Sequence, residues 1–210
     1  MRSLTSVKAL EDFGRRRLSQ SFFMREFLHS EISQIESIPN VPTNVDLAVA
    51  AGSGLCEHVL EPLQERLGRL SIRSAYRSPA VNARGAANGN EYGCASNEAN
   101  RARHIWDEKD ESGVMGAMAC VILTTYVSYF KDTRDWRALA WWIHDNISAY
   151  SELEFFTKSE VLAFNIGWRE RNPLKTVHAW APNRVCLTKP GMANHTGSHS
   201  YAYAAWRREA

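Results

Sequence analysis

Apolar residues recur every three or four positions between Thr43 and Gly68, which is the spacing of one face of an α-helix. Thr43 or Asn44 can cap the start of this helix, and Gly68 ends it. Pro62 predicts a kink near the end, because proline lacks the N–H of a helical hydrogen bond. The periodic positions are Val45, Leu47, Ala48, Leu55, Val59, Leu60, Leu63 and Leu67.

Other helices are predicted on both sides of this segment. Residues 1–20 read as a loosely attached, charged helical extension, residues 22–32 as a short helix and turn, and residues 79–84 as a short helix with proline in its first turn. A further helix is expected over residues 134–147. Its apolar face consists of Trp136, Leu139, Ala140, Ile143 and Ile147.

Five apolar or alternating runs predict β-strands. They are residues 70–75, 115–125, 153–156, 162–168 and 176–180. Helices come first and strands then cluster without regular crossover helices, which favours an α+β fold with a mostly antiparallel sheet flanked by helices. We expect a single domain over residues 21–210, preceded by the extension of residues 1–20. Residues 85–100 are rich in Gly, Asn, Ala and Ser and indicate an irregular loop.

The composition is that of an ordinary globular protein. Of 210 residues, 44% are hydrophobic and 23% are charged, and the net charge is +2. So small a charge argues against nucleic acid as a partner. No segment is long and apolar enough to span a membrane, and residues 1–20 lack the apolar region of a signal peptide. We therefore expect synthesis in the cytoplasm.

The cysteines and tryptophans change this picture little. Cys56, Cys94, Cys120 and Cys186 are irregularly spaced and form no C-x-x-C pair, which indicates a reducing compartment rather than a disulfide scaffold. The seven tryptophans can fill the core or line a ligand groove.

The most distinctive motif follows the first predicted strand. Tyr76-Arg77-Ser78-Pro79 ends the strand, and Asn82 follows shortly after. An arginine at the mouth of a strand can bind a carboxylate of a substrate, and the alternative is a structural ion pair. With three upstream segments, this motif resembles the zinc D-alanyl-D-alanine carboxypeptidase family over about residues 20–85. These segments are Phe22–Phe27, Ile38–Pro42 and Val59–Gly68.

The resemblance implies a Hedgehog/DD-peptidase fold, a zinc cofactor and peptidoglycan or another D-Ala-containing peptide as partner. In that family, an S-x-H-x-x-G-x-A-x-D motif and a later Trp-His pair supply three zinc ligands, and a glutamate three residues before the Trp is the general base. Arg77 corresponds to the arginine that helps to bind the substrate.

This sequence departs from the family pattern at the zinc positions. Cys120 replaces the aspartate ligand and Asn165 the final histidine, while Gly113 stands where the first histidine is expected. Val161 occupies the position of the general base, and Glu160 lies one residue away. Asparagine is a weak neutral ligand, so the zinc site is either lost or rebuilt from other residues.

A rebuilt site would use the residues before the second predicted strand. His104, Asp107 and Asp110 lie close together in the sequence, and His178 is a further candidate ligand for zinc. The alternatives are a solvated acidic turn for the first three residues and a half-buried histidine at position 178. His104 can replace the missing first histidine only if an insertion of nine residues separates it from the strand.

Three further hypotheses concern isolated side chains. Cys120 could act as a nucleophile with His104 as its base, although a cysteine within an apolar strand is more often an inert core residue. His195 and His199 are four residues apart, but their Gly- and Asn-rich surroundings indicate a loop rather than a metal-binding helix. His144 is expected on a helix surface.

Two functions remain open at this stage. The first is a divergent peptidoglycan-peptide hydrolase with a rearranged or lost zinc site, resembling an endolysin. The second is a non-catalytic module on the same fold that binds cell-wall material or peptide through Arg77 and a tryptophan-rich groove. In either case a chain made in the cytoplasm would reach the cell wall after lysis or in a phage particle.

Overall fold

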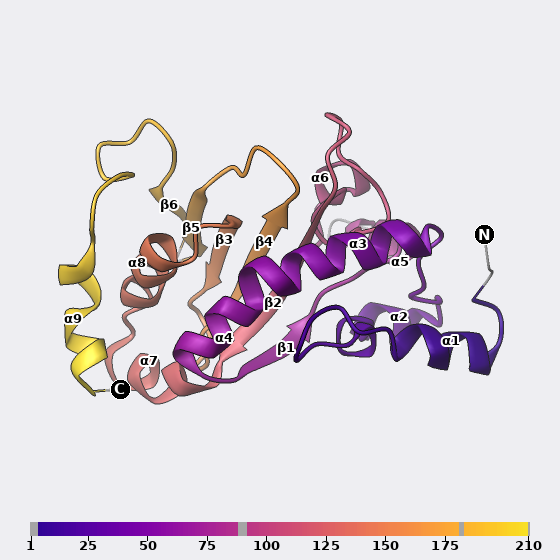
Figure 1. Ribbon diagram of the computed structural model, residues 1–210, viewed down its shortest axis with the longest axis horizontal. Helices are drawn as coiled ribbons and strands as arrows, with labels where there is room; N and C mark the ends of the chain where they lie inside the picture. The colour runs from indigo at the N-terminus through magenta and orange to yellow at the C-terminus, as the bar shows by residue number, and fades with distance from the viewer. Residues whose placement is uncertain (1–3, 88–91, 181–182, 210) are drawn as a thin grey trace.

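The computed structural model describes residues 4–87, 92–180 and 183–209, and these contain a six-stranded sheet (Figure 1). The strand order is β1-β2-β4-β3-β5-β6, and all neighbours are antiparallel except β3 and β5. The α+β fold and the five predicted strands are confirmed, whereas β6 was not predicted. The strands are β1 (Leu70–Ser74), β2 (Gly116–Leu123), β3 (Tyr150–Phe156), β4 (Ala163–Arg169), β5 (Thr176–Trp180) and β6 (Arg184–Thr188).

The predicted helices over residues 43–68, 79–84 and 134–147 are also confirmed, with small changes at their ends. The α-helices are α1 (Val7–Gly14), α2 (Glu31–Glu36), α3 (Val45–Leu55), α4 (Glu61–Leu67), α5 (Pro79–Ala86), α6 (Asn97–Asn100), α7 (Val127–Thr133), α8 (Arg137–Asn146) and α9 (Ser200–Glu209). Short 3₁₀ segments are η1 (Met24–Phe27) and η3 (Thr124–Tyr126). Part of the predicted loop over residues 85–100, residues 88–91, lies outside the described residues.

A nearly continuous helical run joins α3 to α4 through a π-helical turn, η2 (Cys56–Leu60). The side chain of Asn44 caps the run by accepting a hydrogen bond from the N–H of Leu47 at 3.1 Å. Pro62 has no N–H, and its ring crowds the carbonyl of the preceding turn, so the wider π turn directly before it relieves the clash. The structure thus has a π turn next to Pro62, where the sequence predicted a kink.

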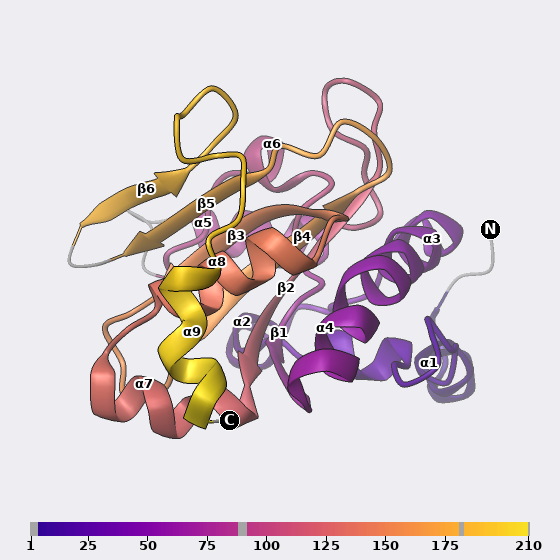
Figure 2. The same cartoon turned by 60° about the vertical axis from the view of Figure 1, so that its left-hand side comes forward.

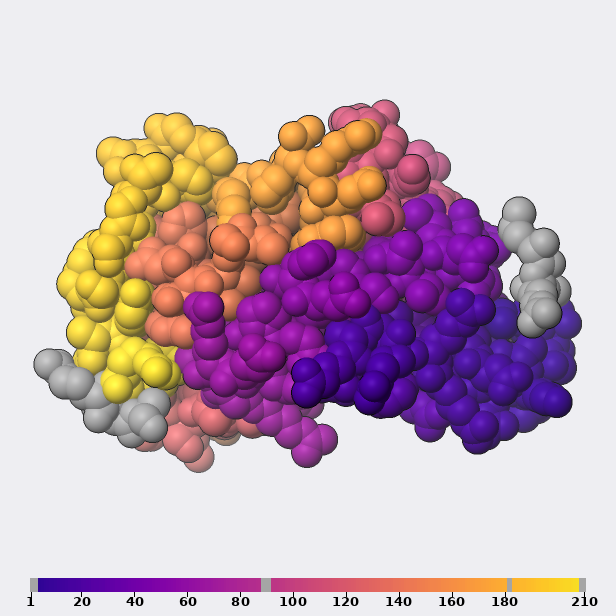
Figure 3. All heavy atoms as spheres, in the orientation of Figure 1, coloured from indigo at the N-terminus to yellow at the C-terminus, as the bar shows by residue number. Residues whose placement is uncertain are grey.

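Alternation along the strands gives the sheet one apolar face. On that face Ala119, Val121, Phe164 and Ile166 are fully buried, and α3 packs against β2 and β4. Figure 1 shows α3 and α4 crossing in front of β2, and Figure 3 shows the same helices covering the middle of this side. The close approach needs small residues, since a Cβ atom on Gly54 would lie 2.3 Å from the Trp168 ring.

Both ends of the chain pack onto this core. Phe13 and Leu18 lie in the predicted extension of residues 1–20, and both are buried in this core. The described part of the extension and the domain that follows it therefore share one core. At the other end α9 lies against α8 (Figure 2). Trp206 is 2% exposed and meets the Tyr126 ring edge-on at 4.7 Å. The sequence predicted only an aromatic tail here, because the partner of Trp206 is distant in the sequence.

Two further findings concern the helices and the cysteines. No helix in the described part of the chain combines the length and apolar character needed to cross a membrane. All four cysteines are free.

Candidate functional site

The second face of the sheet carries a cleft of about 850 Å³. Each of the six strands contributes to it, and the segment of residues 92–104 lines the end near β1. This volume is within the range of natural ligand sites. The strand residues that line the cleft are Arg73, Ser74, Met118, Cys120, Glu154, Phe156, Asn165, Trp180 and Arg184.

A row of polar side chains crosses the floor of this cleft. Residues paired directly across neighbouring strands point to the same face of a sheet. Cys120 is paired with Ser74 on one side and with Asn165 on the other. Asn165 is in turn paired with Glu154, and Glu154 with His178. The structure thus makes Cys120 and Asn165 direct neighbours, at the two positions that the family resemblance assigns to zinc ligands.

Arg77 lies at the β1 end of the same cleft. Its Nη1 donates hydrogen bonds to Asn82 Oδ1 at 3.2 Å and to Cys94 Sγ at 2.7 Å, and its backbone N–H donates to the carbonyl of His104 at 2.8 Å. Burial lowers the pKa of the Arg77 guanidinium, yet arginine keeps its charge in proteins. The side chain is therefore a cation held in a fixed position.

Buried amides hold Asn82, and through it Arg77. Asn82 is fully buried and donates to the carbonyl of Ala95 at 3.1 Å and to Asn97 Oδ1 at 2.8 Å. Asn100 donates to Asn82 Oδ1 at 2.9 Å. Every polar group of Asn82 is engaged, so this network fixes the orientation of the arginine. The sequence signalled Asn82, but not the roles of Asn97 and Asn100, which it placed in an irregular loop.

His104 also lines the cleft, beside β2. The N–H of Met118 donates to the carbonyl of Arg103 at 2.8 Å, which places this segment beside β2 although residues 105–115 separate the two in the sequence. His104 Nδ1 lies 2.8 Å from the carbonyl of Ala75, to which it must donate, leaving a lone pair on Nε2. Burial, and secondarily the charge of Arg77, hold the pKa of His104 well below its usual value, so the imidazole is neutral.

Cys120 and Asn165 differ in what they offer a ligand. Burial raises the pKa of the Cys120 thiol to about 11, and Arg73 and Arg77 oppose this effect only in part. The thiol is therefore protonated near neutral pH, which disfavours the nucleophile hypothesis. Asn165 is 9% exposed, and its carboxamide makes no hydrogen bond within the described residues.

The positive charges in the cleft are of two kinds. Arg103 forms an ion pair with Glu152, and Arg184 pairs with Glu154 at 3.3 Å. Arg73 and Arg77, by contrast, have no ion pair with any residue that the structure describes. The alternative interpretation of Arg77 as half of a structural ion pair is thus not supported by its contacts, which are an amide and a thiol.

The two aspartates proposed as metal ligands are both engaged by other residues. Asp107 accepts hydrogen bonds from the N–H and hydroxyl of Thr43, at 2.8 and 3.0 Å, and from the Tyr76 hydroxyl at 3.1 Å. Asp110 accepts from the N–H groups of Ser112 and Val114 and pairs with Arg169. Both carboxylates are occupied, because each organises the segment between α6 and β2.

The donors in the cleft do not fit the zinc centre of the resembled family. Across residues 4–87, 92–180 and 183–209 the structure brings no three His, Cys, Asp or Glu side chains close enough to hold a metal ion. His178 stands in the polar row two strands from Asn165. Gly113, Val161 and Glu160 are exposed in turns. We therefore derive no catalytic step through a metal.

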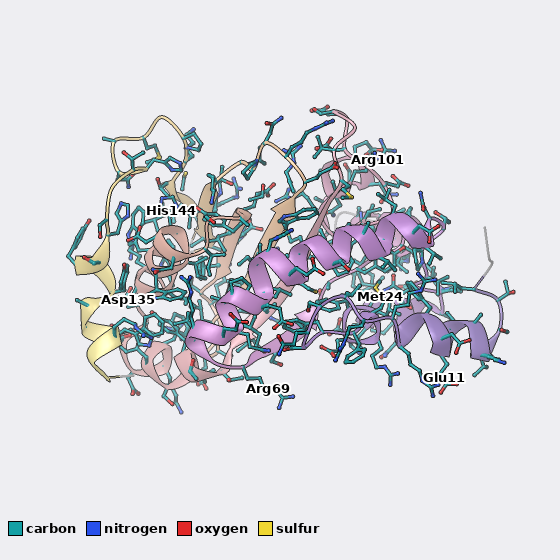
Figure 4. All side chains as sticks on the ribbon, in the orientation of Figure 1. Glu11, Met24, Arg69, Arg101, Asp135 and His144 are labelled. Atoms are coloured by element: carbon teal, nitrogen blue, oxygen red, sulfur yellow. The ribbon has the colours of Figure 1, made fainter. Side chains whose placement is uncertain are left out.

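The other histidines anchor the C-terminal segment. His144, labelled in Figure 4, approaches the Tyr150 hydroxyl with Nδ1 at 2.5 Å and the carbonyl of His195 with Nε2 at 2.9 Å. His199 contacts Asp145 at 2.7 Å. None of these three histidines lines the cleft, so they bind the loop before α9 to α8.

Comparison with known proteins adds no relative to this description. No family model matches the chain, and neither the curated proteins nor the solved structures that were searched contain a match.

Proposed function

We propose that the cleft binds a peptide through its free C-terminal carboxylate, and that the chain is a non-catalytic relative of the zinc DD-peptidases that recognises D-Ala-terminated cell-wall peptides. The observation that carries this proposal is Arg77, a fixed cation in the cleft without a carboxylate partner among the described residues. A guanidinium held by neutral groups keeps its charge available to a ligand.

The geometry of the guanidinium supports binding of a carboxylate. Asn82 and Cys94 engage Nη1 only, so the Nη2 and Nε groups have no hydrogen bond within the described residues. Arg73 stands at a bulge of β1 and adds a second unpaired cation to the same cleft. Arg73 and the fixed fork of Arg77 are two positive charges, and they outnumber the carboxylate of Glu31 that lines the same cleft, which favours an anionic over a neutral ligand.

The peptide class rests on the family resemblance. The pairing of Cys120 with Asn165 supports the Hedgehog/DD-peptidase fold, because the resemblance assigns the corresponding ligands of that family to one metal. Arg77 shares their cleft, as expected for a substrate-binding arginine. The loss of the ligand set and of the general base favours binding without hydrolysis.

The hydrolase remains a second candidate because of His104. Its Nδ1 is anchored to a carbonyl and its Nε2 is left with a lone pair, which is how many metal-binding histidines are oriented. Metal analysis of the purified protein tests this candidate. Stoichiometric zinc in the wild type that is absent from His104→Ala, together with cleavage of peptidoglycan fragments, would support the hydrolase and contradict a purely binding function.

The proposed function is tested by calorimetric titration with N-acetyl-D-Ala-D-Ala. We expect Arg77→Ala to weaken binding about 10- to 100-fold, since hydrogen bonds to charged groups contribute about 1.5–3 kcal/mol. Amidation of the C-terminus should weaken binding to the wild type equally and have little further effect on the variant.

Arg69→Ala is the matched control, because Arg69 is exposed and its side chain points into solvent (Figure 4). Thermal melting of each variant verifies that the fold is retained. Equal affinities of wild type and Arg77→Ala for the acid would refute the proposed role of the cleft.

A further inference from the structure

The cleft runs across the strands rather than along them. Its lining begins with Arg73 and Ser74 on β1 and continues over every strand to Trp180 on β5 and Arg184 on β6. Four inter-strand steps separate β1 from β5, and each step is about 4.8 Å, which gives about 19 Å. A terminal carboxylate bound at Arg77 would leave most of this length to the rest of a ligand.

The middle of the cleft holds an amide that no other side chain or main-chain group of the described residues engages. Asn165 is 9% exposed, lies on β4 two steps from β1, and has no hydrogen-bond partner among the described residues. The polar atoms of Asn165 are not among the enclosed side-chain atoms without a partner, so they open into the cleft and are available to a ligand. The carboxamide has the donor and the acceptor needed to bind the C=O and the N–H of one extended residue, which point to the same side of the main chain.

The far end of the cleft is aromatic. Trp180 is paired with Phe156 across β5 and β3, and both side chains line the cleft. Trp180 is 39% exposed, unlike most tryptophans in the chain, which are buried. Glu154 cannot offer a free negative charge beside it, because it is paired with Arg184. This end therefore suits an apolar part of a ligand better than an ammonium group.

We infer that the ligand is an extended oligopeptide of about five residues that lies across the strands, with its main chain bound to Asn165 and its N-terminal residue packed on Trp180. The length follows from about 19 Å at about 3.4 Å per extended residue. Asn165 then meets the peptide about three residues from its C-terminus. This inference rests on the proposed function, which supplies the carboxylate bound at Arg77.

The test is a series of N-acetylated peptides of two to six residues, each with alanines before D-Ala-D-Ala, titrated calorimetrically. Affinity should rise with each residue up to five and then level off. Asn165→Leu, which keeps the volume but removes the hydrogen bonds, should weaken the pentapeptide about tenfold and leave the dipeptide unchanged. Trp180→Ala should weaken the pentapeptide but not the tripeptide, and Trp180→Phe should restore most of the loss.

The controls separate this inference from the function on which it rests. Tyr201→Ala removes another exposed aromatic side chain, outside the cleft, and should have no effect. If the dipeptide binds as tightly as the pentapeptide and still depends on Arg77, the extended ligand is wrong while carboxylate binding stands. If Asn165→Leu does not fold, the length dependence of the wild type and the effect of Trp180→Ala still decide. If no peptide of the series binds, both proposals fail.

Discussion

The two faces of the sheet use the same strands for opposite purposes. On the core face, residues such as Val121, Phe164 and Ile166 are fully buried against the helices. On the cleft face, their immediate neighbours Cys120 and Asn165 belong to a polar row that no helix covers completely. Residues of the two sets alternate along each strand, so a shift of one residue in the strand register would exchange the two faces.

The two faces differ in what their side chains require. The apolar side chains of the core face need only close packing, and the helices provide it by lying directly against the sheet. The cleft face carries groups that need hydrogen bonds, and the protein satisfies some of them, such as Arg77 and His104, while Asn165 has none within the described residues. Polar groups that open into a cleft are available to a ligand, whereas the apolar side chains of the core face offer none.

The largest expected effect comes from disturbing the core face at Gly54. A Cβ atom there would lie 2.3 Å from the ring of Trp168, and the ring is itself buried. We expect Gly54→Ala to lower the free energy of unfolding by about 3 kcal/mol, although alanine is the better helix former. Urea denaturation followed by tryptophan fluorescence measures the change.

Ala50→Val adds bulk to an exposed position of the same helix and serves as the control. It should lower the free energy of unfolding by only about 0.5 kcal/mol, because valine is a weaker helix former. If Gly54→Ala were as stable as the wild type, α3 would not approach the sheet as closely as described.

A smaller effect is expected where the cleft segment is attached to the core helices. Asp107 joins Tyr76 to Thr43, just before α3, and the Tyr76 hydroxyl is fully buried. Asp107→Ala leaves this hydroxyl without an acceptor, so we expect a loss of about 2 kcal/mol in the free energy of unfolding. Urea denaturation with and without a chelator measures it.

The chelator decides between the structural role of Asp107 and the metal hypothesis. If Asp107 only accepts hydrogen bonds, the loss in Asp107→Ala is the same with and without chelator. A wild type that is destabilised by the chelator, and a variant that is not, would make Asp107 a metal ligand. Asp132→Ala, at an exposed position of α7, is expected to change little.

The comparison also shows what the sequence could predict. Local signals were sufficient to place Arg77 just after a strand and to predict the strands that bear Cys120 and Asn165. Strand periodicity and a strand-end motif are properties of neighbouring residues, so they can be read from the sequence. Contacts between distant segments were not accessible. The hydrogen bonds of Asp107 to Tyr76 and Thr43 join segments that are distant in the sequence, and no local pattern encodes them.

The same limit applies to the elements that were missed. β6 has only five residues and is mostly exposed, so its apolar and polar positions do not alternate clearly. Trp206 of α9 packs on Tyr126, and α9 lies against α8, which are contacts between distant segments. His104 was singled out as a candidate ligand, and its place beside β2 depends on the hydrogen bond between Met118 and Arg103, which the sequence does not encode locally.

The smallest expected effect concerns the charge of His104 on the cleft face. The pKa of His104 is well below its usual value in the folded protein, chiefly because of burial. Below about pH 6.5 the unfolded chain binds a proton at this residue and the folded chain does not, so stability falls as the pH falls. Between pH 7.5 and 5.5 this contribution amounts to about 1 kcal/mol. Urea denaturation at both pH values measures it.

His104→Asn keeps an N–H donor for the carbonyl of Ala75 but cannot titrate. The wild type should therefore lose about 1 kcal/mol more than the variant between the two pH values, because all other titrating groups are common to both and cancel. An equal loss in the two proteins would mean that His104 takes up its proton in the folded state as readily as in the unfolded chain. The imidazole would then be charged beside Arg77, and the cleft would attract a carboxylate more strongly at low pH.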